Sequence, residues 1–270
     1  MCIAVFMWQA HPLYPLLLLF NRDEFHNRPT KPTSWWEGDE IVGGRDEWAG
    51  GTWLACSRKG KLGFLTNVME PPPNPKRKTR GELIVRFLES SKTPVEFANE
   101  LIAEEADQYN GFNLVLADIR SKTMVYVSNR PIAAARIPVQ VVSPGIHVLT
   151  NAQLDTPWFK AERLNRNFKE VIRRHSDDGA KGEVRLEEMV RKLMRDDTKA
   201  EKSRLPGVWY PEYELEASSI FVEFDTPKGR CGTRSTAALT VTTTEKVNIY
   251  EEYLDKETWK VKKLGYQIEK

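Results

Sequence analysis

The sequence is poor in cysteine and histidine. Its 270 residues contain three cysteines, Cys2, Cys56 and Cys231, and four scattered histidines. An odd number of cysteines without a close pair excludes a disulfide framework or a zinc ribbon as the organising principle of the fold. The histidines lack metal-ligand spacing such as His-Glu-x-x-His. We therefore expect a reducing compartment and no bound metal.

The sequence also lacks a large excess of charge of either sign. Forty Lys and Arg nearly balance 38 Asp and Glu, which leaves a formal net charge of +2. No global field attracts nucleic acid or an anionic membrane, so no nucleic-acid partner is expected. Eight Trp, eight Tyr and eleven Phe are too many for a disordered chain. We expect one globular domain over residues 1–270, ending in a charged tail from about 255 to 270.

The first twenty residues contain no Lys, Arg, Asp or Glu, yet they resemble neither a leader nor a membrane span. The positive segment of a signal peptide is missing, and Gln9, His11, Pro12 and Pro15 interrupt the apolar stretch. We predict no transmembrane segment. Two strands over 2–8 and 16–21, joined by a turn at 11–15, fit the pattern. Nearly continuous apolar strands indicate a sheet that is covered on both faces.

The remaining pattern runs from strands to helices and back to strands. Gly43-Gly44 and Gly50-Gly51 predict turns, and Lys59-Gly60 predicts a hairpin between 53–57 and 62–67. The proline-rich basic segment 69–80 is interpreted as a solvated loop, with phosphate binding as the alternative. Helices are predicted over 83–88, 93–102 with a capping box, 158–175 and 186–194. Further strands are predicted over 112–118, 124–129, 148–151, 219–224 and 236–243, and an irregular connection over 196–216. This order predicts an α+β domain with helices flanking packed sheets.

Nucleophilic chemistry centres on Cys2, which becomes the first residue if Met1 is removed. An α-amine with a pKa of about 7.7–8.0 can take the thiol proton near neutral pH. Arg22, at the end of the neighbouring strand, would favour the thiolate and lower its pKa. Asp23 would orient the α-amine. The competing interpretation is a buried structural cysteine beside an ordinary ion cluster.

Seven short motifs occur in order along the chain. They are Asn21-Arg22-Asp23-Glu24-Phe25, Gly50-Gly51-Thr52-Trp53-Leu54, Leu65-Thr66-Asn67, Tyr109-Asn110-Gly111-Phe112-Asn113-Leu114, Thr150-Asn151-Ala152, Thr156-Pro157-Trp158 and Gly232-Thr233-Arg234. From residue 1 to about 245 the chain resembles the NRDE family, also called the transport and Golgi organization protein 2 family. That family in turn resembles, distantly, N-terminal-nucleophile hydrolases of the choloylglycine and penicillin V acylase type.

The resemblance implies a four-layer αββα sandwich and a set of site residues. Cys2 would be the nucleophile and Arg22 the thiolate-stabilising cation. Asn67 or Asn151 would donate to an oxyanion, and Arg234 would lie near the cleft. In those hydrolases the acidic residue follows the arginine by three positions, whereas Asp23 is adjacent to Arg22. Neighbours on a regular strand point to opposite faces, so both can face Cys2 only across a bulge or turn.

Two functions follow from the resemblance. The first is hydrolysis of the C–N bond of a small acyl amide through a Cys2 thioester, with no cofactor required for catalysis. The alternative is a non-catalytic carrier or chaperone for haem or acyl-CoA, acting in haem trafficking, lipid homeostasis or Golgi organisation. In either case the ligand is small and apolar or amphipathic.

Few residues in the sequence support the carrier alternative. The histidines His11, His26, His147 and His175 and the cysteines are the candidate haem ligands, without an attachment motif. Lys76–Arg80 would meet the phosphates of acyl-CoA. A third hypothesis is membrane interaction through Trp35-Trp36. The competing interpretation is that these two side chains pack on the sheet. We expect a cytoplasmic protein that associates with Golgi or mitochondria.

Overall fold

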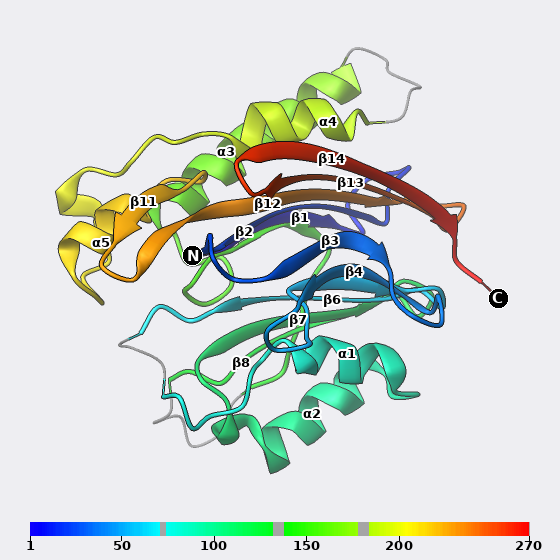
Figure 1. Cartoon of the computed structure of the whole chain (residues 1–270). Helices are drawn as coiled ribbons and strands as arrows, with labels where there is room; N and C mark the ends of the chain where they lie inside the picture. The colour runs from blue at the N-terminus through cyan, green and yellow to red at the C-terminus, as the bar shows by residue number, and fades with distance from the viewer. Residues whose placement is uncertain (71–73, 132–137, 178–183, 270) are drawn as a thin grey trace.

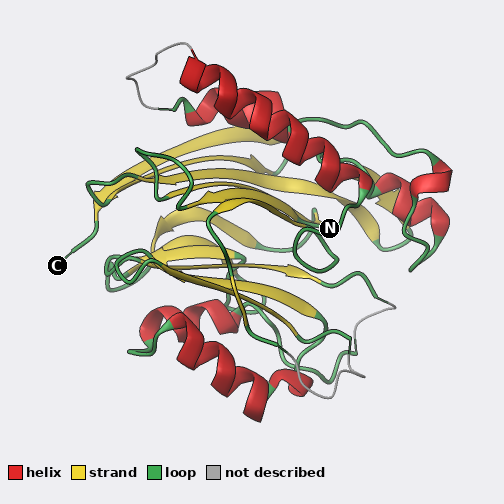
Figure 2. Ribbon diagram, turned by 180° about the vertical axis from the view of Figure 1, so that it is seen from behind, coloured by secondary structure: helices red, strands yellow, loops and turns green. Residues whose placement is uncertain are grey.

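Two antiparallel sheets lie face to face, and helices cover their outer faces (Figure 1). The structure is a computed structural model and describes residues 1–70, 74–131, 138–177 and 184–269. The layers run helix, sheet, sheet, helix when the molecule is viewed edge-on (Figure 2). The protein is therefore a four-layer αββα sandwich, as the resemblance implied.

The first sheet contains the amino-terminal strand in its interior. Its strand order is β10-β1-β2-β12-β13-β14, with β11 paired to β12. The strands are β1 (Ile3–Trp8), β2 (Leu16–Phe25), β10 (Gly145–Leu149), β11 (Glu223–Thr226), β12 (Gly229–Val241), β13 (Lys246–Asp255) and β14 (Thr258–Gln267). Because β1 lies between β2 and β10, two segments that are far apart in the chain, near Asn21 and Leu149, flank Cys2.

The second sheet follows the chain order from β3 to β9. Its strands are β3 (Thr30–Trp35), β4 (Ile41–Asp46), β5 (Leu54–Ser57), β6 (Lys61–Asn67), β7 (Phe112–Asp118), β8 (Thr123–Ser128) and β9 (Gln140–Val141). Helices α1 (Glu82–Glu89) and α2 (Pro94–Glu104) pack on its outer face. The predicted capping box is present at α2, where Thr93 and Glu96 exchange hydrogen bonds. The predicted hairpin is confirmed as β5–β6.

Helix α3 (Phe159–Asp177) and the short α4 (Leu186–Met189) cover the first sheet (Figure 1). The predicted helix over 186–194 does not run as one α-helix, because Val190–Met194 form a π-helical turn. The segment 196–216 is less irregular than predicted, since it contains the 3-10 turn Lys202–Arg204 and α5 (Pro211–Glu216). A further 3-10 turn, Ala106–Gln108, precedes β7.

The alternation of β1 explains why its sequence is apolar on both faces. Ala4, Phe6 and Trp8 enter the core between the sheets, whereas Ile3 and Val5 pack against the helices. All six residues of the strand are buried. The continuous apolar run therefore marks a central strand covered on both sides, as the sequence predicted.

Three sequence predictions are wrong in detail. Gly43-Gly44 lies within β4 and not in a turn, because a Cβ atom on Gly44 would stand 2.2 Å from the Trp53 ring. The expected tail includes β14, which pairs with β13 over ten residues. The strands predicted over 219–224 and 236–243 are shifted, because β11 begins at Glu223 and β12 already begins at Gly229.

Trp35 packs against the core between the two sheets, and Trp36 packs against the core between the second sheet and its helices. This agrees with the interpretation that both tryptophans pack on the sheet. Among the described residues, no helix combines the length and the apolar character needed to cross a membrane.

Candidate functional site

A cavity of about 660 Å³ opens at the end of the sandwich where β1 begins. Its walls come from the start of β1, the end of β2, the β4–β5 connection, the end of β6 and the loop 74–81. Of the six residues expected from the sequence, Cys2, Arg22, Asp23 and Asn67 line it. Asn151 and Arg234 lie outside its lining.

Cys2 is an almost fully buried thiol, 8% exposed, immediately before β1. Its Sγ lies 3.9 Å from the backbone oxygen of Asp23. Burial raises the pKa of this thiol, although the amino terminus and Arg22 act to lower it. Arg22 thus acts on the thiol pKa in the expected direction, but in the chain that carries Met1 the desolvation of a thiolate outweighs the guanidinium.

Arg22 and Asp23 make contacts with different groups, as strand alternation predicts. The Arg22 guanidinium stacks 4.2 Å above the Trp53 ring and donates to Thr30 Oγ1. The Asp23 carboxylate lies 3.3 Å from the Met1 amino group and accepts a hydrogen bond of 2.7 Å from Thr233. Opposite them, the pairing of β12 with β2 shifts register between Thr233 and Ser235. Asp23 thus contacts the amino group of Met1, whereas the nitrogen of Cys2, its expected partner, belongs to a peptide bond in this chain.

Asn67 and Asn151 are hydrogen-bonded to each other, but only Asn67 lines the cavity. Asn151 is 1% exposed, and its Nδ2 donates to the backbone oxygen and to Oδ1 of Asn67, at 2.9 and 3.0 Å. Both Asn151 amide hydrogens are thereby used. Asn67 Nδ2 makes only a 3.3 Å bond to Val68 O and belongs to the cavity wall. Asn67 is therefore the available amide donor, and Asn151 fixes its orientation.

Arg234 lies in a separate small cavity behind Arg22. It donates to the backbone oxygens of Phe25 and Arg28. The cavity measures about 20 Å³, room for about one water molecule, and buried Glu251 also lines it. The Glu251 Oε2 atom accepts a 2.6 Å hydrogen bond from Thr33 N, whereas Oε1 has no partner among the described residues. Burial raises the pKa of Glu251 to about 7, against the hydrogen bonds from Thr33.

The basic loop is part of the cavity and not simply a solvated surface. Arg77, Lys78 and Arg80 all line it. Arg77 donates to Tyr109 O, and Lys78 pairs with Glu105. The half-buried Arg80 guanidinium has no hydrogen-bond or ion-pair partner among the described residues. Burial lowers the pKa of Arg80, while Cys2 and Glu24 act to raise it.

Close backbone packing brings this loop to the site. A Cβ atom on Gly51 would stand 2.4 Å from the carbonyl carbon of Gly81, so only glycine permits this approach. The signal in the sequence was the pair Gly50-Gly51 together with Arg80-Gly81. A local reading of the Pro-rich segment could not place it opposite residue 51.

Sequence reasoning also missed Lys160, the second residue of α3. It is 2% exposed, and its Nζ donates to Met1 O at 3.1 Å. Burial lowers the pKa of Lys160, whereas Asp23 and Cys2 act to raise it. The available signal was a lysine in the first turn of a helix that packs on a central strand.

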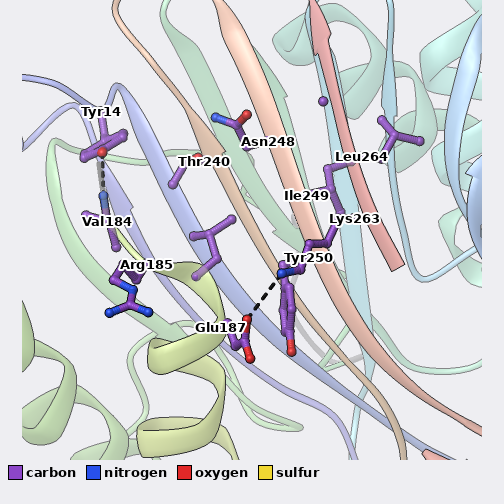
Figure 3. A pocket seen from close by; sticks show the side chains of 12 residues that line it. Tyr14, Val184, Arg185, Glu187, Thr240, Asn248, Ile249, Tyr250, Lys263 and Leu264 are labelled. Atoms are coloured by element: carbon purple, nitrogen blue, oxygen red, sulfur yellow. Dashed lines mark hydrogen bonds and ion pairs between the residues drawn. The ribbon is translucent and has the colours of Figure 1, made fainter. Parts of the chain in front are cut away.

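A second depression of about 550 Å³ lies between α4 and strands β12–β14 (Figure 3). Its polar contacts are internal: Lys263 Nζ lies 3.3 Å from Glu187, and Tyr14 accepts a 2.8 Å hydrogen bond from Val184 N. None of its lining residues is a cysteine or histidine. The histidines are likewise absent from the wall of the Cys2 cavity. Of these two cavities, the first therefore contains the candidate nucleophile, Cys2, in its wall.

The fold and the site define an αββα sandwich with a cysteine at the tip of a central strand. Residues 1–256 match the model of the family "Transport and Golgi organisation 2". The chain therefore belongs to the transport and Golgi organisation 2 family.

Relatives extend over much of the chain. It is 38% identical over 183 residues to the mouse Transport and Golgi organization 2 homolog, covering 64% of each chain. The matched part thus spans slightly less than two thirds of that relative. It is 26% identical over 216 residues to Transport and Golgi organization protein 2 of Drosophila melanogaster, covering 72% of this chain and 71% of that one. A mutant conjugated bile acid hydrolase from Clostridium perfringens superposes with a TM-score of 0.49 at 8% identity, over 99% of this chain and 97% of that chain.

Proposed function

We propose that this protein hydrolyses the C–N bond of a small acyl amide through a thioester on Cys2, after Met1 has been removed. The observation that carries the proposal is the position of Cys2 in the wall of a 660 Å³ cavity that it shares with Arg22 and Asn67. A nucleophile, a cation and an amide donor at one cavity are the parts that acyl transfer requires.

Each of the site residues has a separate role in the proposed reaction. The free amine of Cys2 takes the thiol proton, and Asp23 orients that amine. Sγ attacks the substrate carbonyl carbon and forms a C–S bond, while Asn67 Nδ2 donates to the developing oxyanion. The C–N bond then breaks, and the amine leaves with the proton. Water hydrolyses the thioester, which releases the acid and restores the thiol.

Charge in the cavity favours a substrate with an anionic group. Arg28 pairs with Asp46 at 2.6 Å, but Arg80 has no such partner among the described residues. Trp48, 73% exposed, lines the same cavity and offers an apolar surface. A charged hydrogen bond contributes about 1.5–3 kcal/mol, so Arg80→Met should weaken anion binding about 10- to 150-fold. Lys76→Met, on the same loop but outside the cavity wall, is the matched control.

A second function is supported by the state of the thiol when Met1 is present. Burial raises the pKa of Cys2, so the protein then holds a protonated thiol beside a cationic cavity. Such a cavity suits a carrier of an anionic amphipathic ligand such as acyl-CoA or haem. Family membership supports a role in Golgi organisation. Roles in lipid homeostasis or haem trafficking belong to the proposal alone.

The test begins with the intact mass of protein produced without an amino-terminal tag, before and after a small thiol-reactive probe. Met1-free protein labelled fastest at Cys2 should then release acid from a panel of acyl amides, as followed by mass spectrometry. Cys2→Ala must abolish this activity, and Cys231→Ala must retain it. Turnover that persists in Cys2→Ala would refute the hydrolase. Retained Met1 with an unreactive Cys2 would favour the carrier, which titration with palmitoyl-CoA and haem would then examine.

A further inference from the structure

Lys160 places a buried amino group on the helical side of Cys2. Its Nζ donates at 3.1 Å to Met1 O, the carbonyl oxygen of the peptide group that contains the Cys2 nitrogen. The C=O and C–N bonds of that group together span at most about 2.6 Å. Nζ therefore lies within about 6 Å of the Cys2 backbone nitrogen.

The enclosed charges around this peptide group do not balance. The Met1 amino group and Lys160 are two cations; Lys160 is 2% exposed, and the side chain of Met1 is 10% exposed. Asp23 is the carboxylate that faces them, with its other oxygen bonded to the neutral Thr233. An enclosed excess of positive charge favours loss of a proton from a nearby amine or thiol. The thiol of Cys2 and the amine beside it are the groups that can respond.

The groups around the amine act in opposite directions. Burial lowers the pKa of the Met1 amino group, but Asp23, Cys2 and Cys231 outweigh this effect and raise it. Lys160 acts to lower the same pKa. Reciprocally, Asp23 and Cys2 act to raise the pKa of Lys160, which burial lowers. Ionisation of the thiol and retention of the Lys160 proton therefore favour each other.

We propose that Lys160 is a positioning residue for the Cys2 nucleophile, whose ammonium group favours the ionised thiol and the uncharged amine at residue 2 once residue 1 is removed. Arg22 supplies its charge from the wall of the cavity, and Lys160 supplies a second charge from α3. The thiol is thus flanked by cations that come from two different layers. This inference rests on the proposed hydrolase function.

The experiment measures the ionisation of Cys2 without a substrate. Protein that begins at Cys2 is released from a cleavable leader, checked by intact mass, and alkylated with iodoacetamide across a range of pH. The rate at Cys2 is resolved from Cys56 and Cys231 by peptide mass spectrometry. Lys160→Met should raise the midpoint of this profile by about one to two pH units, because a buried unit charge that favours the thiolate is lost. Lys160→Arg should restore the midpoint to within a few tenths of a unit.

Lys169→Met removes an exposed lysine from the same helix and should leave the profile unchanged. Lys160→Gln is measured in parallel, so that a folding failure of the Met variant still leaves a neutral substitution. An unshifted midpoint in the neutral variants, or an equal rise in Lys160→Arg, would overturn the inference. A shifted midpoint in a protein that hydrolyses no acyl amide would support the role of Lys160 and refute the hydrolase. Hydrolysis with an unshifted midpoint would do the reverse.

Discussion

Glu251 makes the stability of the protein depend on pH in an unusual direction. Its carboxyl group is 1% exposed, and the fold raises its pKa from 4.5 to about 7. Between these values the folded state binds more protons at this site than the unfolded state does. The contribution of Glu251 to stability must therefore fall as pH rises from about 4.5 to 7, and it must level off above that range. A pKa difference of about 2.5 at about 1.36 kcal/mol each corresponds to about 3 kcal/mol.

The perturbation is Glu251→Gln, which keeps an oxygen for the hydrogen bond from Thr33 N but cannot ionise. Urea unfolding followed by tryptophan fluorescence gives the free energy of unfolding of both proteins between pH 4.5 and 8.5. Relative to the wild type, the variant should gain about 3 kcal/mol over this range, most of it below pH 7. A difference between the two proteins that stays constant with pH would show that Glu251 does not titrate with a raised pKa in the folded protein.

The neighbouring residue provides a control of opposite sign. Burial raises the pKa of Glu252, but hydrogen bonds from Arg195 and Tyr250 outweigh it and lower that pKa. A depressed pKa contributes stability at neutral pH that is lost as the pH falls. Glu252→Gln should therefore cost most stability at neutral pH, and its deficit should shrink towards acid. The two adjacent glutamates should give profiles that slope in opposite directions.

Two further predictions concern the walls of the Cys2 cavity. Gly44→Ala places a methyl group 2.2 Å from the Trp53 ring and should destabilise the fold by about 1–3 kcal/mol; circular dichroism should record a lower Tm, and an unchanged Tm would show that the ring moves freely. Asn67→Ala removes the available amide donor and should reduce turnover of an acyl amide by about 10²–10³. That loss should come with little change in Tm, and full activity would exclude Asn67 as the donor.

Local patterns were sufficient wherever an element is determined by its own residues. The range predicted for β7, 112–118, is the range observed, and Thr93 and Glu96 marked the start of α2 correctly. The apolar run of β1 predicted its burial on both faces. By contrast, Gly43-Gly44 was misassigned because the need for glycine at position 44 comes from the ring of Trp53, which directly precedes the neighbouring strand β5. The strand β14 is rich in lysine, and exposed residues occur along its whole length. Because it shows little apolar alternation, the sequence predicted a charged tail there instead of a strand.

Residue patterns alone predicted the site only where side chains belong to adjacent strands, and Asn67 was expected from the family resemblance. Cys2, Arg22 and Asp23 follow from the pairing of β1 with β2. Arg80 and Lys160 could not be found in this way, because each reaches Cys2 through packing between elements far apart in the chain. The distinction between Asn67 and Asn151 depends on which amide is already hydrogen-bonded, and no residue pattern records that.

The interior position of β1 also sets an order of events during synthesis. Cys2 and the strand that follows it emerge first, but β10 and then β12, which completes the pairing of β2, emerge far later. At 5–20 residues per second, about 10–50 s separate β1 from β12. Throughout that interval the Met1–Cys2 bond is open to a processing enzyme, and afterwards Asp23 and Lys160 enclose it. If the proposed removal of residue 1 takes place, we therefore expect it on the nascent chain and not on the finished protein.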